Sequence, residues 1–326
     1  MHILVLGGAG MVGRKFIERL ARDGGLGGKP VTRVTAQDVV PASPPPAAPF
    51  DFEAVVSDLS VEGAAETLIA TRPELIVHLA AIVSGEAEAD FDKGYRINLD
   101  GTRYLFEAIR RIEGYTPRLV FTSSVAVFGA PFHDKIEDEF FTTPLTSYGT
   151  QKAIGELLLC DYSRRGFFDG VGIRLPTICV RPGKPNKAAS GFFSNIIREP
   201  LNGEEAVLPV SDQVRHWHAS PRSAVGFLVH AATMDTTAIG PRRALTMPGY
   251  SCTVAEQIET LRKVAGENVV KRIKRVPDPV IDGIVAGWPR NFDPQRALAL
   301  GFKAESNFEE IIRVHIEDEL HGTFVK

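Results

Sequence analysis

A short apolar run, a cluster of glycines and a helix-like stretch open the chain, and this order constrains the fold more than any other feature. Residues 2–6 are rich in Leu, Ile and Val, and Gly7, Gly10 and Gly13 follow them. Residues 11–22 then carry apolar side chains at helical spacing. A strand, a glycine turn and a helix in this order begin a βαβ unit, which predicts a parallel sheet.

Each of these three glycines has its own reason to lack a side chain. Gly7 permits the tight turn, Gly10 lets the backbone approach a pyrophosphate, and Gly13 lets the helix pack close to the strand. The helix N-terminus, which includes Met11 and Val12, offers free N–H groups to the phosphates. The loop therefore predicts a dinucleotide site, and the alternative is an ordinary turn that binds nothing.

The alternation of strands and helices continues through the first half of the chain. It predicts an α/β Rossmann fold, in which a doubly wound parallel sheet is covered by helices on both faces. Further strands are expected within 31–40, at 55–56, at 75–78, at 118–122 and at 171–174, and helices at 97–112 and 147–165.

The alternation fades beyond residue 175, which suggests a change of domain. Prolines and glycines crowd residues 176–185. We expect residues 1–175 to form an NAD-binding Rossmann domain, with a return segment near 220–247. Residues 176–219 and 248–326 are expected to form a smaller C-terminal substrate-binding subdomain.

Charge and cysteine content exclude several kinds of function. The formal net charge of −3 gives no attraction for nucleic acid or an anionic membrane. The chain has no run of about 20 apolar residues, and its opening run is too short for a signal peptide. Its three cysteines, Cys160, Cys179 and Cys252, are too far apart for a disulfide framework or a metal cluster. We therefore expect a cytoplasmic protein without metal, nucleic-acid or membrane partners.

Two aspartates follow strands of the predicted sheet and bear on the choice of cofactor. Asp38 would accept hydrogen bonds from the adenosine ribose and repel the extra phosphate of NADP, which favours NAD. Arg33 lies too early in that strand to hold such a phosphate. Asp58, followed by Leu59, would place a carboxylate on the adenine amino group. The alternative for Asp58 is a helix N-cap before residues 60–70.

Tyr148 and Lys152 lie four residues apart in a predicted helix and so share one face. A tyrosine titrates near pH ~10 and is a weak base at neutral pH. A lysine ammonium one turn away favours the phenolate. Ser123 and Ser124 end the fifth strand, at the sheet edge where ligands gather, and Ser124 would orient the substrate oxygen.

Together these features resemble the extended short-chain dehydrogenase/reductase family, over roughly the first 180 residues. The resemblance implies that Tyr148 is the general base, Lys152 its helper and Ser124 the catalytic serine. It also implies a homodimer through the helices at 97–112 and 147–165. Phe128 stands where epimerases of the family usually carry tyrosine. Further matching residues are His78, Leu79, Ala80, Ala81, Asn98, Phe128 and Gly129, together with Leu175, Pro176 and Thr177.

The same resemblance assigns some of these residues to the cofactor and others to the substrate. Leu79, Ala80 and Ala81 match the segment that lines the cofactor, and Asn98 matches a helix residue behind it. Leu175-Pro176-Thr177 matches the segment that touches the nicotinamide amide. We therefore place Pro176 with the cofactor and Thr177 with the substrate.

The second half of the chain bears on the substrate. The segment Arg215-His216-Trp217-His218 keeps the arginine of the Arg-Asp-Tyr-like segment of epimerases but not the rest. A guanidinium holds a carboxylate with two hydrogen bonds, so Arg215 is the expected carboxylate anchor; the alternative is a domain-interface ion pair. The cationic run 181–187 also suits a small carboxylate, unless it is only a solvated loop. Ser84, after the fourth strand, is a further candidate.

We therefore expect NAD-dependent oxidation of a small carboxylate substrate. As a whole the chain is similar to family members that oxidise the C2 hydroxyl of a four-carbon sugar acid; the stretches 174–178, 190–194 and 215–218 carry this similarity. Three alternatives stay open: a sugar-nucleotide epimerase, an enzyme like L-threonine dehydrogenase, and a non-catalytic NAD-sensing regulator. The intact Ser124, Tyr148 and Lys152 argue against the regulator.

Overall fold

The computed structural model describes residues 1–183 and 189–326. The chain forms two compact units, each with its own core. Unit 1 comprises residues 1–127, 146–175 and 225–246, and unit 2 comprises residues 128–145, 176–224 and 247–326. Lys184 and Lys187, from the predicted cationic run, lie outside the described residues.

A seven-stranded parallel sheet forms the centre of unit 1, which confirms the predicted Rossmann-type fold. The order of its strands is β13-β9-β7-β6-β1-β4-β5. The chain therefore moves outward from β1 on one side and then continues on the other, so the order reverses between β1 and β6. The strands are β1 (His2–Leu6), β4 (Arg33–Asp38), β5 (Asp51–Val56), β6 (Leu75–His78), β7 (Arg118–Ser124), β9 (Asp169–Leu175) and β13 (Ala244–Thr246).

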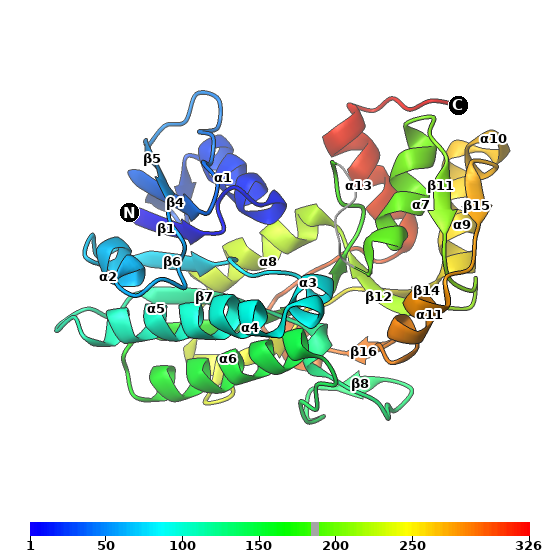
Figure 1. Cartoon of the computed structure of the whole chain (residues 1–326). Helices are drawn as coiled ribbons and strands as arrows, with labels where there is room; N and C mark the ends of the chain where they lie inside the picture. The colour runs from blue at the N-terminus through cyan, green and yellow to red at the C-terminus, as the bar shows by residue number, and fades with distance from the viewer. Residues whose placement is uncertain (184–188) are drawn as a thin grey trace. The chain divides into compact units, whose positions relative to one another are not determined.

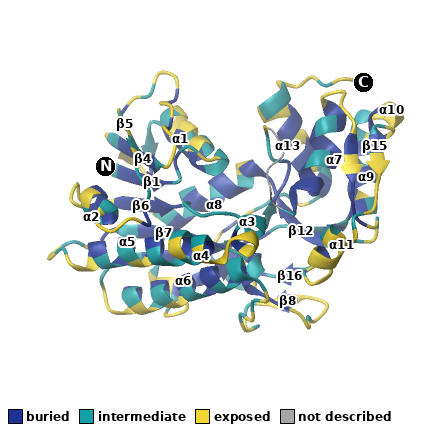
Figure 2. Ribbon diagram, viewed as in Figure 1, coloured by how far each residue is buried: buried dark blue, intermediate teal, exposed yellow. Residues whose placement is uncertain are grey.

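Helices cover both faces of this sheet. Apolar side chains from α2, α5 and α6 pack against β1, β6 and β7 on one face. Helices α1 and α8 lie on the other face (Figure 1). Because both faces are covered, the strands are mostly buried, except for the edge strand β5, whose residues are exposed or half-buried (Figure 2). The helices are α1 (Met11–Asp23), α2 (Ala64–Ile69), α3 (Ser84–Ala89), α4 (Phe91–Gly94), α5 (Gly101–Arg110), α6 (Ser147–Arg164) and α8 (Pro221–Thr233), with short helical turns at Val125–Val127 and Thr237–Ile239.

The predicted helix over 97–112 has a different form in the structure. It begins as a π-helical turn, Tyr95–Asp100, and continues as α5. The wider turn contains Asn98, whose buried side chain bonds to other segments. A short hairpin of β2 (Gly25–Leu26) and β3 (Lys29–Pro30) was not predicted; it is too short to show an alternating pattern.

Unit 2 is built on a small sheet in the order β10-β12-β14. Its strands are β10 (Thr177–Ile178), β12 (Arg215–Ala219) and β14 (Tyr250–Thr253). Two further strand pairs join β11 (Ala206–Leu208) to β15 (Ile273–Arg275) and β8 (Ile136–Glu137) to β16 (Phe292–Asp293). The helices are α7 (Gly191–Leu201), α9 (Val254–Ala265), α10 (Glu267–Val270), α11 (Pro279–Ala286), α12 (Gln295–Ala299) and α13 (Phe308–Leu320).

Among the described residues, no helix has the length and apolar character needed to cross a membrane. These residues also contain no group of three or more His, Cys, Asp or Glu side chains placed to hold a metal ion.

Candidate active site

The glycine loop connects β1 to α1 and has the close contacts that its glycines require. Gly7 has a φ of +85°, and a Cβ there would lie 2.8 Å from the backbone nitrogen of Ala80. A Cβ on Gly13 would lie 2.3 Å from the carbonyl oxygen of Gly7. Leu79 and Ala80, both predicted to line the cofactor, therefore lie directly against the loop.

Gly10 differs from these two glycines, because the protein packs no atom against it as closely as against Gly7 and Gly13. A Cβ on Gly10 would meet only the Gly7 oxygen, at 3.3 Å. Gly10 is also the N-cap of α1, and no side chain of the described residues caps that helix. The N–H groups of its first turn, including Met11 and Val12, are therefore open to an anionic ligand. The loop thus fits a pyrophosphate group.

Asp38 ends β4 beside this loop. One of its carboxylate oxygens accepts the Ala9 N–H at 3.0 Å, and the other accepts the Val39 N–H at 2.7 Å. Each oxygen of a carboxylate has two lone pairs, so both can accept one more hydrogen bond. The carboxylate is thus fixed next to the loop with acceptor capacity left for ribose hydroxyls.

Asp58 makes a local turn and does not cap a helix. It accepts hydrogen bonds from the Ser60 N–H at 2.9 Å and the Ser60 hydroxyl at 2.6 Å. Helix α2 begins later, and Gly63 is its N-cap, so the N-cap alternative is wrong. Burial opposes ionisation, but the Ser60 hydrogen bonds and the Arg96 guanidinium, 3.3 Å away, hold the pKa of Asp58 below its ordinary value. The side chain of Leu59 is buried in the core, which leaves only its backbone for a cofactor.

Asn98 is a buried clamp between two segments of unit 1. Its amide oxygen accepts the Ile82 N–H at 2.9 Å, just after Ala81. Its amide nitrogen donates to the Gln151 side-chain oxygen at 2.8 Å. Asn98 therefore lies behind the Leu79–Ala81 segment and joins it to α6.

Ser124, Tyr148 and Lys152 all belong to unit 1, at the end of β7 and in the first turns of α6. The Thr146 hydroxyl accepts the Gly149 N–H and so fixes the start of α6. The Ser124 hydroxyl oxygen accepts the Ala126 N–H at 3.1 Å. This bond orients the serine and does not use its own hydrogen.

Lys152 is almost completely buried, and a hydrogen bond holds its ammonium in place. Its ammonium donates to the Thr122 carbonyl at 2.8 Å and lies 5.8 Å from the centre of the Tyr148 ring. Burial lowers the pKa of Lys152 to about 8, and the negative charge of Glu156 opposes this effect. Lys152 therefore stays cationic at neutral pH and favours the phenolate form of Tyr148.

Glu156 lies one turn beyond Lys152 and was missed by the sequence reasoning. Arg174 donates three hydrogen bonds of 2.7–3.1 Å to its carboxylate, and the Ser123 hydroxyl donates a fourth at 2.5 Å. Ser123 therefore has its hydroxyl hydrogen directed at Glu156, whereas that of Ser124 is not used by Ala126. A glutamate four residues after Lys152 on one helical face was the available signal.

The residues predicted to meet the substrate are held by different kinds of contact. Ser84 is the first residue of α3, in unit 1. In unit 2, the Arg215 guanidinium forms an ion pair with Glu256 at 3.1 Å and donates to the Ser251 carbonyl at 3.2 Å. Both partners of this ion pair belong to unit 2, so it is not the ion pair at a domain interface that was the alternative for Arg215. Thr177, which follows Pro176, bonds to the His216 ring at 2.7 Å.

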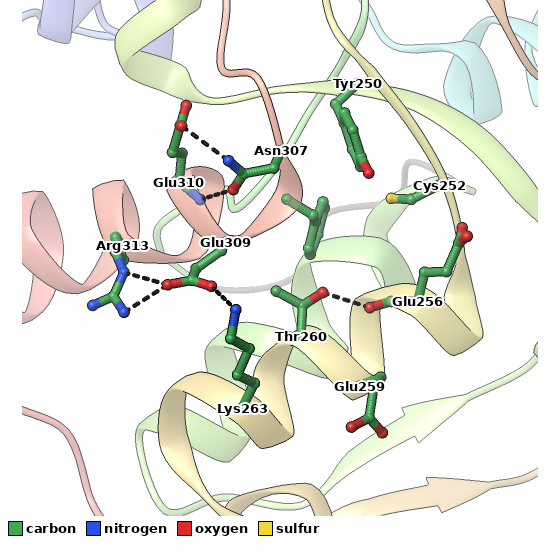
Figure 3. Close-up of a pocket in the computed structure, with 11 residues that line it drawn as sticks. Tyr250, Cys252, Glu256, Glu259, Thr260, Lys263, Asn307, Glu309, Glu310 and Arg313 are labelled. Carbon is green, nitrogen blue, oxygen red and sulfur yellow. Dashed lines mark hydrogen bonds and ion pairs between the residues drawn. The ribbon is translucent and has the colours of Figure 1, made fainter.

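A separate pocket of about 650 Å³ lies in unit 2, between α9 and the start of α13 (Figure 3). Its wall holds four glutamates and two cations, and both cations pair with Glu309: Lys263 at 2.8 Å and Arg313 at 2.7 Å. None of the predicted site residues lines this pocket. We therefore assign it no part in the reaction.

Comparison with known proteins decides the family. Residues 3–233 match the NAD dependent epimerase/dehydratase family. The chain belongs to this family. Membership confirms the resemblance found in the sequence and makes the chain an enzyme that uses NAD.

Two relatives match both units over nearly their whole length. The D-erythronate dehydrogenase of Cupriavidus necator is 47% identical over 98% of each chain. That of Haemophilus influenzae is 40% identical over 98% of this chain and 100% of its own.

Solved structures show the same fold. A crystal structure described as a nucleoside-diphosphate-sugar epimerase from Agrobacterium tumefaciens is 66% identical, with a TM-score of 0.97 over 99% of this chain and 95% of its own. An L-threonine dehydrogenase from Clostridium difficile has a TM-score of 0.83 over 99% of each chain. At 20% identity it shares the fold alone.

Proposed function

We propose that this chain oxidises the C2 hydroxyl of D-erythronate to the ketone of 2-dehydro-D-erythronate, with NAD as the oxidant. The observation that carries the proposal is the match to two D-erythronate dehydrogenases, which extends over 98% of the chain. Both units are therefore shared with these relatives, including the substrate-binding half that we assign to unit 2.

We assign the cofactor to the loop edge of unit 1. The phosphates would meet Gly7, Gly10 and the first turn of α1, with Gly13 keeping that helix close. Asp38 would hold the adenosine ribose, Asp58 the adenine, and Lys152 the nicotinamide ribose. Further cofactor contacts are proposed for Met11, Val12, Leu59, Leu79, Ala80, Ala81, Asn98, Ser123, Tyr148 and Pro176.

The proton chemistry would be performed by side chains of β7 and α6. Bound NAD supplies the acceptor for the hydride that leaves C2. Ser124 would donate a hydrogen bond to the C2 oxygen, and the Tyr148 phenolate would take the hydroxyl proton. The products are the ketone, NADH and the phenol form of Tyr148, so charge and electrons balance.

The carboxylate of the substrate needs a cation, and Arg215 is the proposed anchor. Its guanidinium is 37% exposed, and its partner Glu256 is 54% exposed. A substrate carboxylate would replace Glu256 as the partner of Arg215, with two hydrogen bonds. Ser84 and Thr177 would meet the hydroxyl groups of the substrate.

We further propose a cytoplasmic homodimer that acts in sugar-acid catabolism. Helices α5 and α6 would form the dimer interface, as in the family that the sequence resembles.

A sugar-nucleotide epimerase is the second candidate, favoured by the description of the Agrobacterium tumefaciens structure at 66% identity. The experiment is to follow NADH formation by ultraviolet absorbance with D-erythronate, L-threonine and UDP-sugars. We expect NADH with D-erythronate alone. Conversion of a UDP-sugar without net NADH, and no reaction with the acid, would replace the proposal with the epimerase.

A further inference from the structure

A series of hydrogen bonds in unit 2 fixes the direction in which the Thr177 hydroxyl points its hydrogen. We assigned Thr177 to substrate binding above. The series runs from the Pro289 carbonyl through the His216 ring to the Thr177 hydroxyl. His216 Nδ1 lies 2.8 Å from the Pro289 oxygen, and His216 Nε2 lies 2.7 Å from Thr177 Oγ1.

The first link sets the tautomer of the histidine. A carbonyl oxygen can only accept, so Nδ1 of His216 carries a hydrogen and donates it to Pro289. His216 is 3% exposed, and its ring stacks on Phe193 with centres 5.4 Å apart. Burial, together with the charge of Arg181, lowers the pKa of His216 to about 4, although the Pro289 bond opposes this. The ring is therefore neutral, and its Nε2 carries a lone pair.

The second link sets the polarity of the threonine. Because Nε2 of His216 has no hydrogen, Thr177 must donate its only hydroxyl hydrogen to it. The lone pairs of the Thr177 oxygen are all that is left for a ligand. Thr177 is only half-buried, so this oxygen can meet one.

A hydroxyl held in this way accepts hydrogen bonds but cannot donate them. It matches the hydroxyl group of a polyol acid, which can donate. It opposes the oxygens of a diphosphate or a carboxylate, which only accept at neutral pH.

We propose that His216 is a positioning residue that makes Thr177 an acceptor for a substrate hydroxyl, and thereby selects a hydroxyl group over an anionic oxygen at this position. This inference rests on the proposed function and adds a specificity-determining pair to it. The nicotinamide carboxamide also carries N–H donors, so the test must separate the cofactor from the substrate.

The test compares Thr177→Val, which removes the hydroxyl at nearly constant shape, with the matched control Thr177→Ser, which keeps it. The substrates are D-erythronate and its 3-deoxy and 4-deoxy analogues. We expect Thr177→Val to raise KM for D-erythronate roughly three- to tenfold, the size of one neutral hydrogen bond. The kcat should change by less than about twofold. One deoxy analogue should show no further loss, and Thr177→Ser, which keeps the hydroxyl, should recover most of the affinity that Thr177→Val loses.

Two more measurements separate positioning from a merely structural role. His216→Leu should raise the same KM, and combining it with Thr177→Val should add little, because both remove one interaction. The dissociation constant for NADH should stay unchanged in Thr177→Val. If His216→Leu does not fold, the Thr177 pair and the deoxy analogues still decide the question.

Three results would overturn the inference: an equal loss on D-erythronate and both analogues, a weaker affinity for NADH, or additive effects of the two substitutions. These results are distinct from a failure of the proposed function. If the proposed function is wrong, the wild type itself will not oxidise D-erythronate, and the inference is then wrong together with the proposed function.

Discussion

Lys152 in unit 1 and Arg215 in unit 2 are both cations that we assign to the reaction, but their surroundings differ. Lys152 is almost fully buried, donates to the Thr122 carbonyl, and has the buried carboxylate of Glu156 one turn away. Arg215 is 37% exposed, and its carboxylate partner Glu256 is 54% exposed.

The contrast separates two uses of charge. The charges around Lys152 are desolvated and held by hydrogen bonds, so in the mechanism that we propose they would act on Tyr148 in the same way in every catalytic cycle. The ion pair of Arg215 is open to solvent and weak, so a ligand can exchange into it. We infer that unit 1 carries preorganised chemistry, whereas unit 2 carries exchangeable recognition.

The largest effect on the reaction is expected from removal of the proposed base, Tyr148. Tyr148→Phe should lower kcat by roughly a thousandfold, the usual range for a lost general base. The affinity for NADH, measured by fluorescence quenching, should hardly change. Activity within tenfold of the wild type would refute the assignment of Tyr148.

The next effect concerns the fixed carboxylate. Glu156→Gln should lower the free energy of unfolding by about 3 kcal/mol, because it leaves the half-buried Arg174 without its ion pair. Loss of this negative charge also disfavours the ammonium form of Lys152, so the Tyr148 phenolate is less stabilised. The acidic limb of the pH–rate profile should therefore move to higher pH.

A denaturant titration of Glu156→Gln and a pH–rate profile check both effects. Glu107→Gln is the control, because it removes a glutamate of unit 1 that is only partly buried and pairs with Arg110. The control should leave the pH–rate profile unchanged. A profile that moves equally in both variants would show that Glu156 is only structural.

Burial of Lys152 should also be visible in the pH dependence of stability. The pKa of Lys152 is about 8 in the folded chain, below the ordinary value of about 10.4. Between these values the unfolded chain binds more protons, so the free energy of unfolding gains about 3 kcal/mol as the pH rises. Denaturation of Lys152→Met across this window should lack that gain relative to the wild type. An identical pH dependence in the two proteins would contradict it.

The smallest effects are expected at the exposed pair. Glu256→Gln should lower KM for D-erythronate a few-fold, because it frees Arg215 while a glutamine still serves the capping box of α9. Arg215→Met should raise the same KM roughly tenfold, by loss of a charged hydrogen bond. Steady-state kinetics on both variants measures the difference. KM values equal to that of the wild type in both variants would show that Arg215 does not bind the substrate.

The sequence predicted most of unit 1, because local signals determine it. The glycines, the strand-end Asp38 and the spacing of Tyr148 and Lys152 all depend on positions within one βαβ unit or one helical turn. Glu156 was missed because a glutamate on a helix usually faces solvent. Its burial depends on Arg174, which reaches it from β9.

Unit 2 was less predictable, because its contacts join distant segments. Glu256 is 41 residues after Arg215 in sequence, and the strand pairing of β12 with β14 brings them together. The Pro289 contact of His216 spans 73 residues and follows no periodic pattern. Such contacts arise from tertiary packing, which composition and spacing do not encode.

The amide clamp of Asn98 has a consequence for redesign of this enzyme. One side chain fixes both the backbone at Ile82 and, through Gln151, the helix that carries Tyr148. The segment that we assign to the cofactor and the helix that we assign to proton transfer are therefore positioned by the same side chain. In the mechanism that we propose, a substitution at Asp38 would alter coenzyme preference without touching these bonds, whereas a substitution at Asn98 would disturb the cofactor segment and the Tyr148 helix together.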